Sequence, residues 1–152
     1  MAAPTHEQKR DLFQRHFMLG KLEPGEIDTL ARRAGVESYR AGQEIFAKDS
    51  PGRTMFAVLQ GSVKIVSLSP TGTEVVLSVI HPGDFFGEIA VIDGEGRTAG
   101  AAAMTDCELL IIDRRDVRPM FVRDDAARGG ALRPGDRSAR PRLVPRLLHA
   151  AR

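Results

Sequence analysis

One short segment of this 152-residue chain combines residues that could bind both a phosphodiester and a sugar. Gly87 permits close backbone approach, and residues 88–92 can form one helical turn whose free N–H groups face an anion. Arg97 and Thr98 follow a Gly-rich loop, so a guanidinium and a hydroxyl can complete a phosphodiester cradle. A carboxylate beside a phosphate would repel it. Glu88 is therefore better suited to accept a hydrogen bond from a sugar hydroxyl, held near Arg97 for charge balance.

The order of these residues resembles the phosphate-binding cassette of cyclic-nucleotide-binding domains. The segment reads G-E-I-A at 87–90 and R-T-A at 97–99, with Arg97 nine residues after Glu88. The G-D-x-F-G-E approach at 83–88 extends the likeness, which covers roughly residues 20–121. The chain is similar to the sensor domain of the CRP/FNR (catabolite activator) bacterial transcription regulators. It is also similar to the cyclic-nucleotide domains of protein kinase A regulatory subunits and gated channels.

The resemblance implies a role for each residue of the cassette. Glu88 would bind the ribose 2′-hydroxyl and Arg97 the cyclic phosphate, while Thr98 and nearby main-chain N–H groups would bind phosphate oxygens. The candidate ligand-binding residues are Gly87, Glu88, Ile89, Ala90, Arg97, Thr98 and Ala99. The expected ligand is cAMP, with cGMP as the alternative, and no cofactor is expected.

The elements that must position this segment are mostly strands. Short β-branched runs alternate with turn signals from residue 36 onward, which is typical of a β-sandwich or roll. The clearest of the predicted strands lie at 44–47, 54–60, 62–68, 74–80, 98–104 and 107–112. About eight short strands without helices between them favour an antiparallel β-roll, or double-stranded jelly roll, over a parallel sheet. The predicted class is all-β with helical flanks.

Helical patterns lie on both sides of these strands. Leu12, Phe13 and Phe17 recur at helical spacing, Pro24 opens a second helix, and Asp113 can cap a short helix through Phe121. Three parts are therefore expected. They are an N-terminal helical flank at 1–35, a cyclic-nucleotide-binding β-roll with a closing helix at 36–121, and a basic Pro/Gly/Arg-rich tail at 122–152.

The charge of the chain is divided between the body and this tail. Residues 122–152 hold eight Arg and three Asp, a local charge of +5, whereas residues 1–121 carry a net −3. Pro and Gly interrupt the tail repeatedly, so we expect it to be disordered, without the long dimer helix and helix-turn-helix of a CRP-type regulator. Sequence-specific DNA binding by this chain is therefore not expected, and a homodimer stays open.

Three function hypotheses follow. The first is a cyclic-nucleotide sensor domain that signals by ligand binding without catalysis. The second is a transcription regulator that contacts DNA through its atypical basic tail, since eight arginines can neutralise phosphates. The third is a degenerate interaction domain that has lost its ligand.

Other chemistry has little support in the sequence. A single cysteine, Cys107, excludes an internal disulfide and is expected to be a small core residue. No paired serine and histidine suggests a nucleophile, so no catalytic residue is predicted. The four histidines are scattered without a carboxylate at ligand spacing, so we expect surface histidines and no metal: His6, His16, His81 and His149. No long apolar run or signal peptide is visible, and a cytoplasmic protein without membrane contact is expected.

Overall fold

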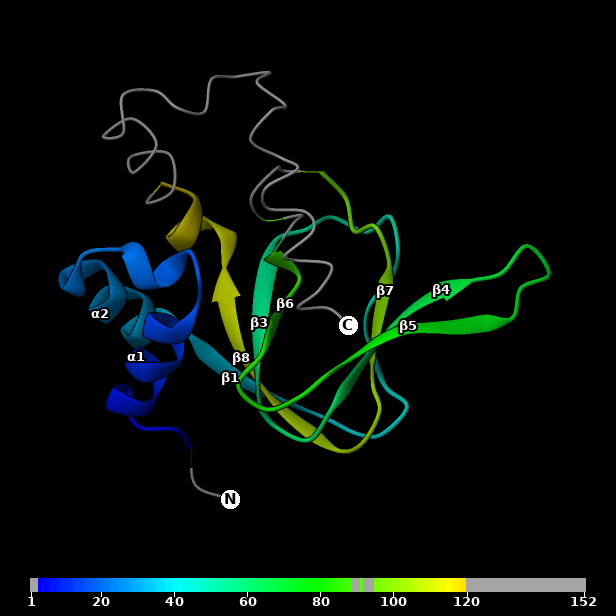
Figure 1. The fold of residues 1–152 in the computed structure, drawn as a ribbon, viewed down its shortest axis with the longest axis horizontal. Helices are drawn as coiled ribbons and strands as arrows, with labels where there is room; N and C mark the ends of the chain where they lie inside the picture. The colour runs from blue at the N-terminus through cyan, green and yellow to red at the C-terminus, as the bar shows by residue number, and fades with distance from the viewer. Residues whose placement is uncertain (1–2, 89–90, 92–94, 120–152) are drawn as a thin grey trace.

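Two four-stranded antiparallel sheets make up most of the fold in this computed structural model, which describes residues 3–88, 91 and 95–119 (Figure 1). The first sheet has the order β1 (Gly35–Tyr39), β8 (Cys107–Asp113), β3 (Thr54–Gln60), β6 (Phe85–Phe86). The second has the order β2 (Glu44–Phe46), β7 (Gly100–Ala103), β4 (Val63–Leu68), β5 (Glu74–Ile80). Every strand pair is antiparallel, which confirms the predicted jelly-roll class.

The strand order joins segments that are far apart in the sequence. β8 pairs with both β1 and β3, and β7 pairs with both β2 and β4. The predicted strands agree with the observed ones to within two residues at each end. β6 is not among the predicted strands, because two residues are too few to show an alternating pattern.

Two helices and a short 3₁₀ turn precede the sheets: α1 (His6–Arg15), η1 (Leu19–Lys21) and α2 (Pro24–Arg33). α1 begins with a capping box, in which Thr5 and Gln8 each accept a hydrogen bond from the other's backbone N–H. α2 begins at a proline, whose missing N–H costs nothing in the first turn. After β8, Asp113 accepts the backbone N–H of Arg115, and residues 114–119 are helical as expected.

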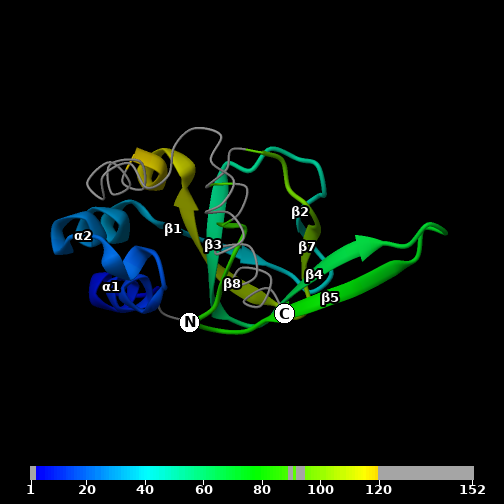
Figure 2. The ribbon, with the colours of Figure 1, turned by 45° about the horizontal axis from the view of Figure 1, so that its top comes forward.

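The first sheet lies between two hydrophobic cores. Figure 2 shows the helices on one side of this sheet and the second sheet on the other. Alternate residues of β8 face opposite ways, so Leu110 and Ile112 pack with the helices while Cys107 and Leu109 pack between the sheets. Burial on both faces explains why residues 109–112 of this strand are all apolar. Cys107 is buried, as predicted.

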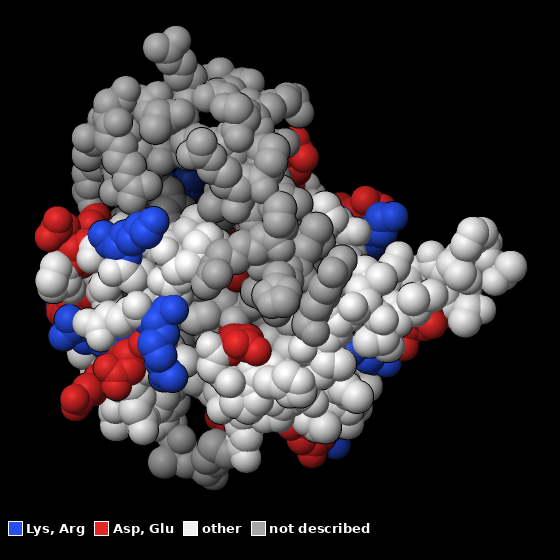
Figure 3. Space-filling view, viewed as in Figure 1, with Lys and Arg blue, Asp and Glu red and all other residues white. Residues whose placement is uncertain are grey.

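The far end of the β4–β5 hairpin projects away from both cores (Figure 1), whereas Val63, Ile65 and Ile80 at its base belong to the core between the sheets. Its exposed large apolar side chains are Leu68, Val75, Val76 and Leu77. An ion pair of 2.7 Å between Lys64 Nζ and Glu74 Oε2 joins the two strands. On the face shown in Figure 3, the projecting end carries uncharged side chains, and charged ones lie nearer its base. None of the helices in the described ranges is long and apolar enough to span a lipid bilayer.

Candidate functional site

Gly87 follows β6 and has a backbone conformation that favours glycine. Its φ is +81°, in the left-handed region. A Cβ atom at this position would lie 2.8 Å from Nη1 of Arg97. Glycine therefore allows both the turn after β6 and the close approach of the guanidinium.

Arg97 is held by backbone carbonyls and an aromatic ring. Nη1 donates to the Gly87 carbonyl oxygen at 2.7 Å, and Nη2 donates to the carbonyl oxygen of Thr54. The guanidinium carbon lies 4.1 Å from the centre of the Phe46 ring. The main chain of Arg97 also pairs with the 47–53 loop, where Ser50 accepts its N–H at 2.9 Å. These contacts fix the plane of the guanidinium.

The Arg97 side chain is a buried cation with one N–H group that makes no hydrogen bond to the described residues. The residue is only 4% exposed, and burial lowers the pKa of Arg97 to about 10, so it stays protonated at neutral pH. Among the described residues, its Nε has no hydrogen-bond partner. A buried N–H without a partner is costly, by about 1–3 kcal/mol, and an anion oxygen would relieve that cost. The site thus fits a bound anion.

The other predicted residues occupy different surroundings. Thr98 is exposed, so its hydroxyl is open to a ligand. Ala99 is half-buried and packs against the core between the sheets. Ile89 and Ala90 lie outside the described residues. Arg97 and Gly87 meet where β6 ends and β3 begins, whereas the side chain of Glu88 faces the helical flank.

Glu88 pairs with a histidine rather than with Arg97, which corrects the expectation that the arginine balances its charge. The Glu88 side chain is 3% exposed, and its Oε2 is in hydrogen-bond contact with Nε2 of His16, which is 4% exposed. No ion pair joins Glu88 to Arg97 within the described part of the chain. The prediction that His16 is a surface residue is therefore also wrong. One signal was available, because His16 shares the helical face of Leu12 and Phe13.

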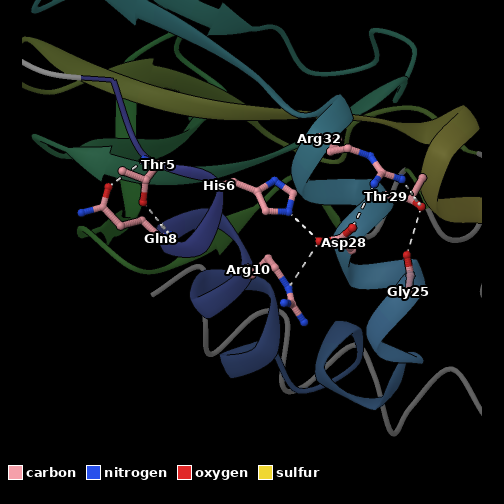
Figure 4. Close-up of polar contacts among 8 residues, drawn as sticks. All are labelled: Thr5, His6, Gln8, Arg10, Gly25, Asp28, Thr29 and Arg32. Atoms are coloured by element: carbon pink, nitrogen blue, oxygen red, sulfur yellow. Dashed lines mark hydrogen bonds and ion pairs between the residues drawn. The ribbon is translucent and has the colours of Figure 1, made fainter.

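A second histidine, His6, also meets a carboxylate, although it lies at the surface as predicted. Figure 4 shows His6 of α1 pointing at Asp28 of α2, with Nε2 and Oδ1 2.6 Å apart. Arg32 Nη1 lies 2.9 Å from the other carboxylate oxygen, and Arg10 Nε lies 3.9 Å from Oδ1. The hydrogen bond from His6 is the main reason that the pKa of Asp28 lies below its ordinary value. The contacts of His6 and Arg10 with Asp28 therefore join α1 to α2 at the surface of the protein.

A surface hollow of about 410 Å³ lies apart from the cassette residues, against β1 and β8. It is lined by polar groups together with Tyr39 and Cys107. Burial raises the pKa of Tyr39 to about 12, and burial also raises the pKa of the Cys107 thiol. Both side chains are therefore protonated at neutral pH, which does not favour Cys107 as a nucleophile. The described residues also contain no group of three or more His, Cys, Asp or Glu side chains able to hold a metal ion.

The chain belongs to the cyclic nucleotide-binding domain family, whose model matches residues 36–124. It is 31% identical over 97 residues to a CRP-like cAMP-activated global transcriptional regulator of Mycobacterium tuberculosis, covering 64% of this chain and 43% of that protein. It is 33% identical over 102 residues to a cyclic AMP receptor protein of Thermus thermophilus, covering 67% of this chain and 47% of the relative. The chain thus spans less than half the length of these curated relatives.

The fold is also that of solved nucleotide-binding domains. The structure superposes on the regulatory domain of Toxoplasma gondii PKA, solved with cAMP, with a TM-score of 0.72 and 23% identity. The match covers 76% of this chain and 44% of that one. At this identity the likeness concerns the fold, and it agrees with the two-sheet architecture described above.

Proposed function

We propose that this chain binds a 3′,5′-cyclic purine nucleotide, cAMP in preference to cGMP, and signals by binding without catalysing a reaction. The observation that carries the proposal is Arg97, a buried cation whose Nε has no partner among the described residues. A cyclic phosphate offers both the negative charge and the acceptor oxygen that this group needs. The relatives named for cAMP support the choice of nucleotide.

Each cassette residue has one task in this proposal. Arg97 and the Thr98 hydroxyl bind the cyclic phosphate, together with main-chain N–H groups of residues 89–90. Glu88 accepts a hydrogen bond from the ribose 2′-hydroxyl, which keeps its charge away from the phosphate. Gly87 and Ala99 leave room for the backbone to approach the ligand.

Isothermal titration calorimetry and thermal-shift measurements with cAMP and cGMP test the proposal. We expect saturable heat and a raised melting temperature with cAMP, a smaller response with cGMP, and none with 5′-AMP as a ring-opened control. A bound ligand raises the melting temperature because it binds only the folded state. No heat and no shift with either cyclic nucleotide at millimolar concentration would exclude nucleotide binding.

The charge distribution favours nonspecific nucleic-acid contact as a second candidate function. Residues 122–152, which lie outside the described residues, carry the local charge of +5. Contacts of this kind release counterions, so DNA binding should weaken steeply with salt and disappear when residues 122–152 are deleted. Nucleotide binding should largely survive the deletion. A footprint on one defined sequence, strengthened by cAMP at physiological salt, would show instead that the chain reads DNA specifically.

A further inference from the structure

His16 is held on several sides in one orientation. Its Nδ1 lies 3.1 Å from the backbone N of Met18 and 3.1 Å from that of Leu19. The ring stacks on Phe17, with centroids 4.8 Å apart, and meets Phe85 edge-on at 4.7 Å. The imidazole therefore has little freedom to turn.

These contacts determine which ring nitrogen carries the proton. Two backbone N–H groups are aimed at Nδ1, so Nδ1 must be an acceptor and cannot carry a proton of its own. The proton then lies on Nε2, which faces Oε2 of Glu88. His16 is therefore a neutral donor to the Glu88 carboxylate, with its tautomer set by the turn that follows α1.

A single donor leaves the carboxylate able to bind a sugar as well. A carboxylate has two oxygens and about four lone-pair sites, of which the His16 hydrogen bond uses one. A buried carboxylate needs donors to remain ionised, and a fixed donor also holds it in one rotamer. A carboxylate fixed before the ligand arrives loses less conformational entropy when the ligand binds.

We propose that His16 is a positioning residue of the nucleotide site, which holds in place the Glu88 carboxylate that would bind the ribose 2′-hydroxyl. The proposal rests on the proposed function, because it concerns the sugar half of the same site. It makes the junction between α1 and η1 part of that site, although it lies 72 positions before Glu88 in the sequence. Movement of Glu88 on binding would then be felt in the helical flank.

The test compares cAMP with 2′-deoxy-cAMP in three variants of the full chain. His16→Gln keeps an N–H donor near the position of Nε2, and His16→Leu has similar bulk without a donor. His6→Leu is the matched control, since it removes a histidine–carboxylate contact from the same helix at a site away from the cassette.

We expect wild type to bind cAMP at least about tenfold more tightly than 2′-deoxy-cAMP, as for a hydrogen bond to a charged group. His16→Leu should reduce this ratio several-fold, mainly by weakening cAMP, whereas His16→Gln and His6→Leu should preserve most of it. A ratio that His16→Leu leaves unchanged, whether both affinities fall together or neither does, would overturn the positioning role. Absence of cyclic-nucleotide binding in wild type would contradict the proposed function itself.

A measurement on the wild-type chain keeps the proposal testable if His16→Leu does not fold. Nitrogen-15 NMR of the histidine rings should show His16 protonated on Nε2 alone at neutral pH. The Nε2–H resonance should shift on adding cAMP and shift much less on adding 2′-deoxy-cAMP. A His16 ring protonated on Nδ1, or an Nε2–H resonance that moves equally with both nucleotides, would overturn the proposal.

Discussion

The charged residues of the cassette and those around Asp28 use similar chemical groups in opposite surroundings. Glu88 and Arg97 are 3% and 4% exposed, and each is held by a few short contacts from other elements. The Asp28 carboxylate is 35% exposed, and His6 and Arg32 beside it are 44% and 62% exposed. Water and salt weaken the electrostatic attraction between the exposed charges around Asp28. Removing the partner of a buried charge, in contrast, strongly destabilises the folded protein. The comparison indicates that the cassette is where a single substitution should matter most.

The largest effect is expected from Arg97. Arg97→Ala should weaken cyclic-nucleotide binding by about 2 kcal/mol or more, roughly 30-fold, because a charge-assisted donor to the phosphate is removed. Arg97→Lys should not restore wild-type affinity, since an ammonium cannot reproduce the planar guanidinium. Arg32→Ala, which removes an exposed arginine from the Asp28 group, serves as the control and should bind normally. Equal affinities for wild type, Arg97→Ala and Arg97→Lys would show that Arg97 does not bind the nucleotide.

Gly87→Ala should destabilise the fold through both the backbone and Arg97. A positive φ costs an L-residue about 1–2 kcal/mol, and the added Cβ would also press on Nη1 of Arg97. Gly42→Ala is the matched control, because Gly42 has a φ of +86° and no atom within 4 Å of the corresponding Cβ. In urea unfolding, Gly87→Ala should lose more stability than Gly42→Ala and should also weaken nucleotide binding. Equal losses of stability in the two variants would mean that contact between the new Cβ and Arg97 does not contribute to the destabilisation.

A smaller effect on binding is expected from Thr98. Its exposed hydroxyl is a neutral donor, so Thr98→Ala should cost about 1 kcal/mol of binding free energy, roughly fivefold in affinity. The control is Thr29→Ala, which removes a hydroxyl that donates to the Gly25 carbonyl oxygen in α2. Calorimetric titration of each variant with cAMP gives the order of their affinities directly. A loss for Thr98→Ala as large as for Arg97→Ala would contradict the assignment of the main phosphate contact.

The smallest effect is expected from Asp28→Asn, and it should depend on pH. The hydrogen bond from His6 holds the pKa of Asp28 below its ordinary value of 3.8. Asp28 therefore adds stability that is present above 3.8 and is lost as pH falls through the lower folded value. At neutral pH and low salt, Asp28→Asn should melt slightly below wild type, and the gap should close in acid. A gap that persists in acid or is unaffected by salt would show that the effect is not electrostatic.

Local pattern in the sequence was sufficient for most of the secondary structure. β-Branched runs between Gly- and Pro-rich turns located the strands, and the cap at Asp113 located the last helix. These features depend on neighbouring residues, whose spacing is visible in the chain itself. The motif G-E-I-A followed by R-T-A likewise indicated the family, because its residues are close in sequence.

The partners of the cassette residues were decided only by the tertiary structure. Arg97 donates a hydrogen bond to the Thr54 carbonyl oxygen, 43 positions away, and Glu88 is hydrogen-bonded to His16 in the N-terminal flank. Such contacts depend on how β3, β6 and α1 pack together, and no local rule links their sequences. His16 shows the reason most clearly. Its spacing places it on the buried face of a helix. Its neutral tautomer, however, is set by the backbone N–H groups of Met18 and Leu19, and its carboxylate partner is set by the packing of the segment after β6 against α1.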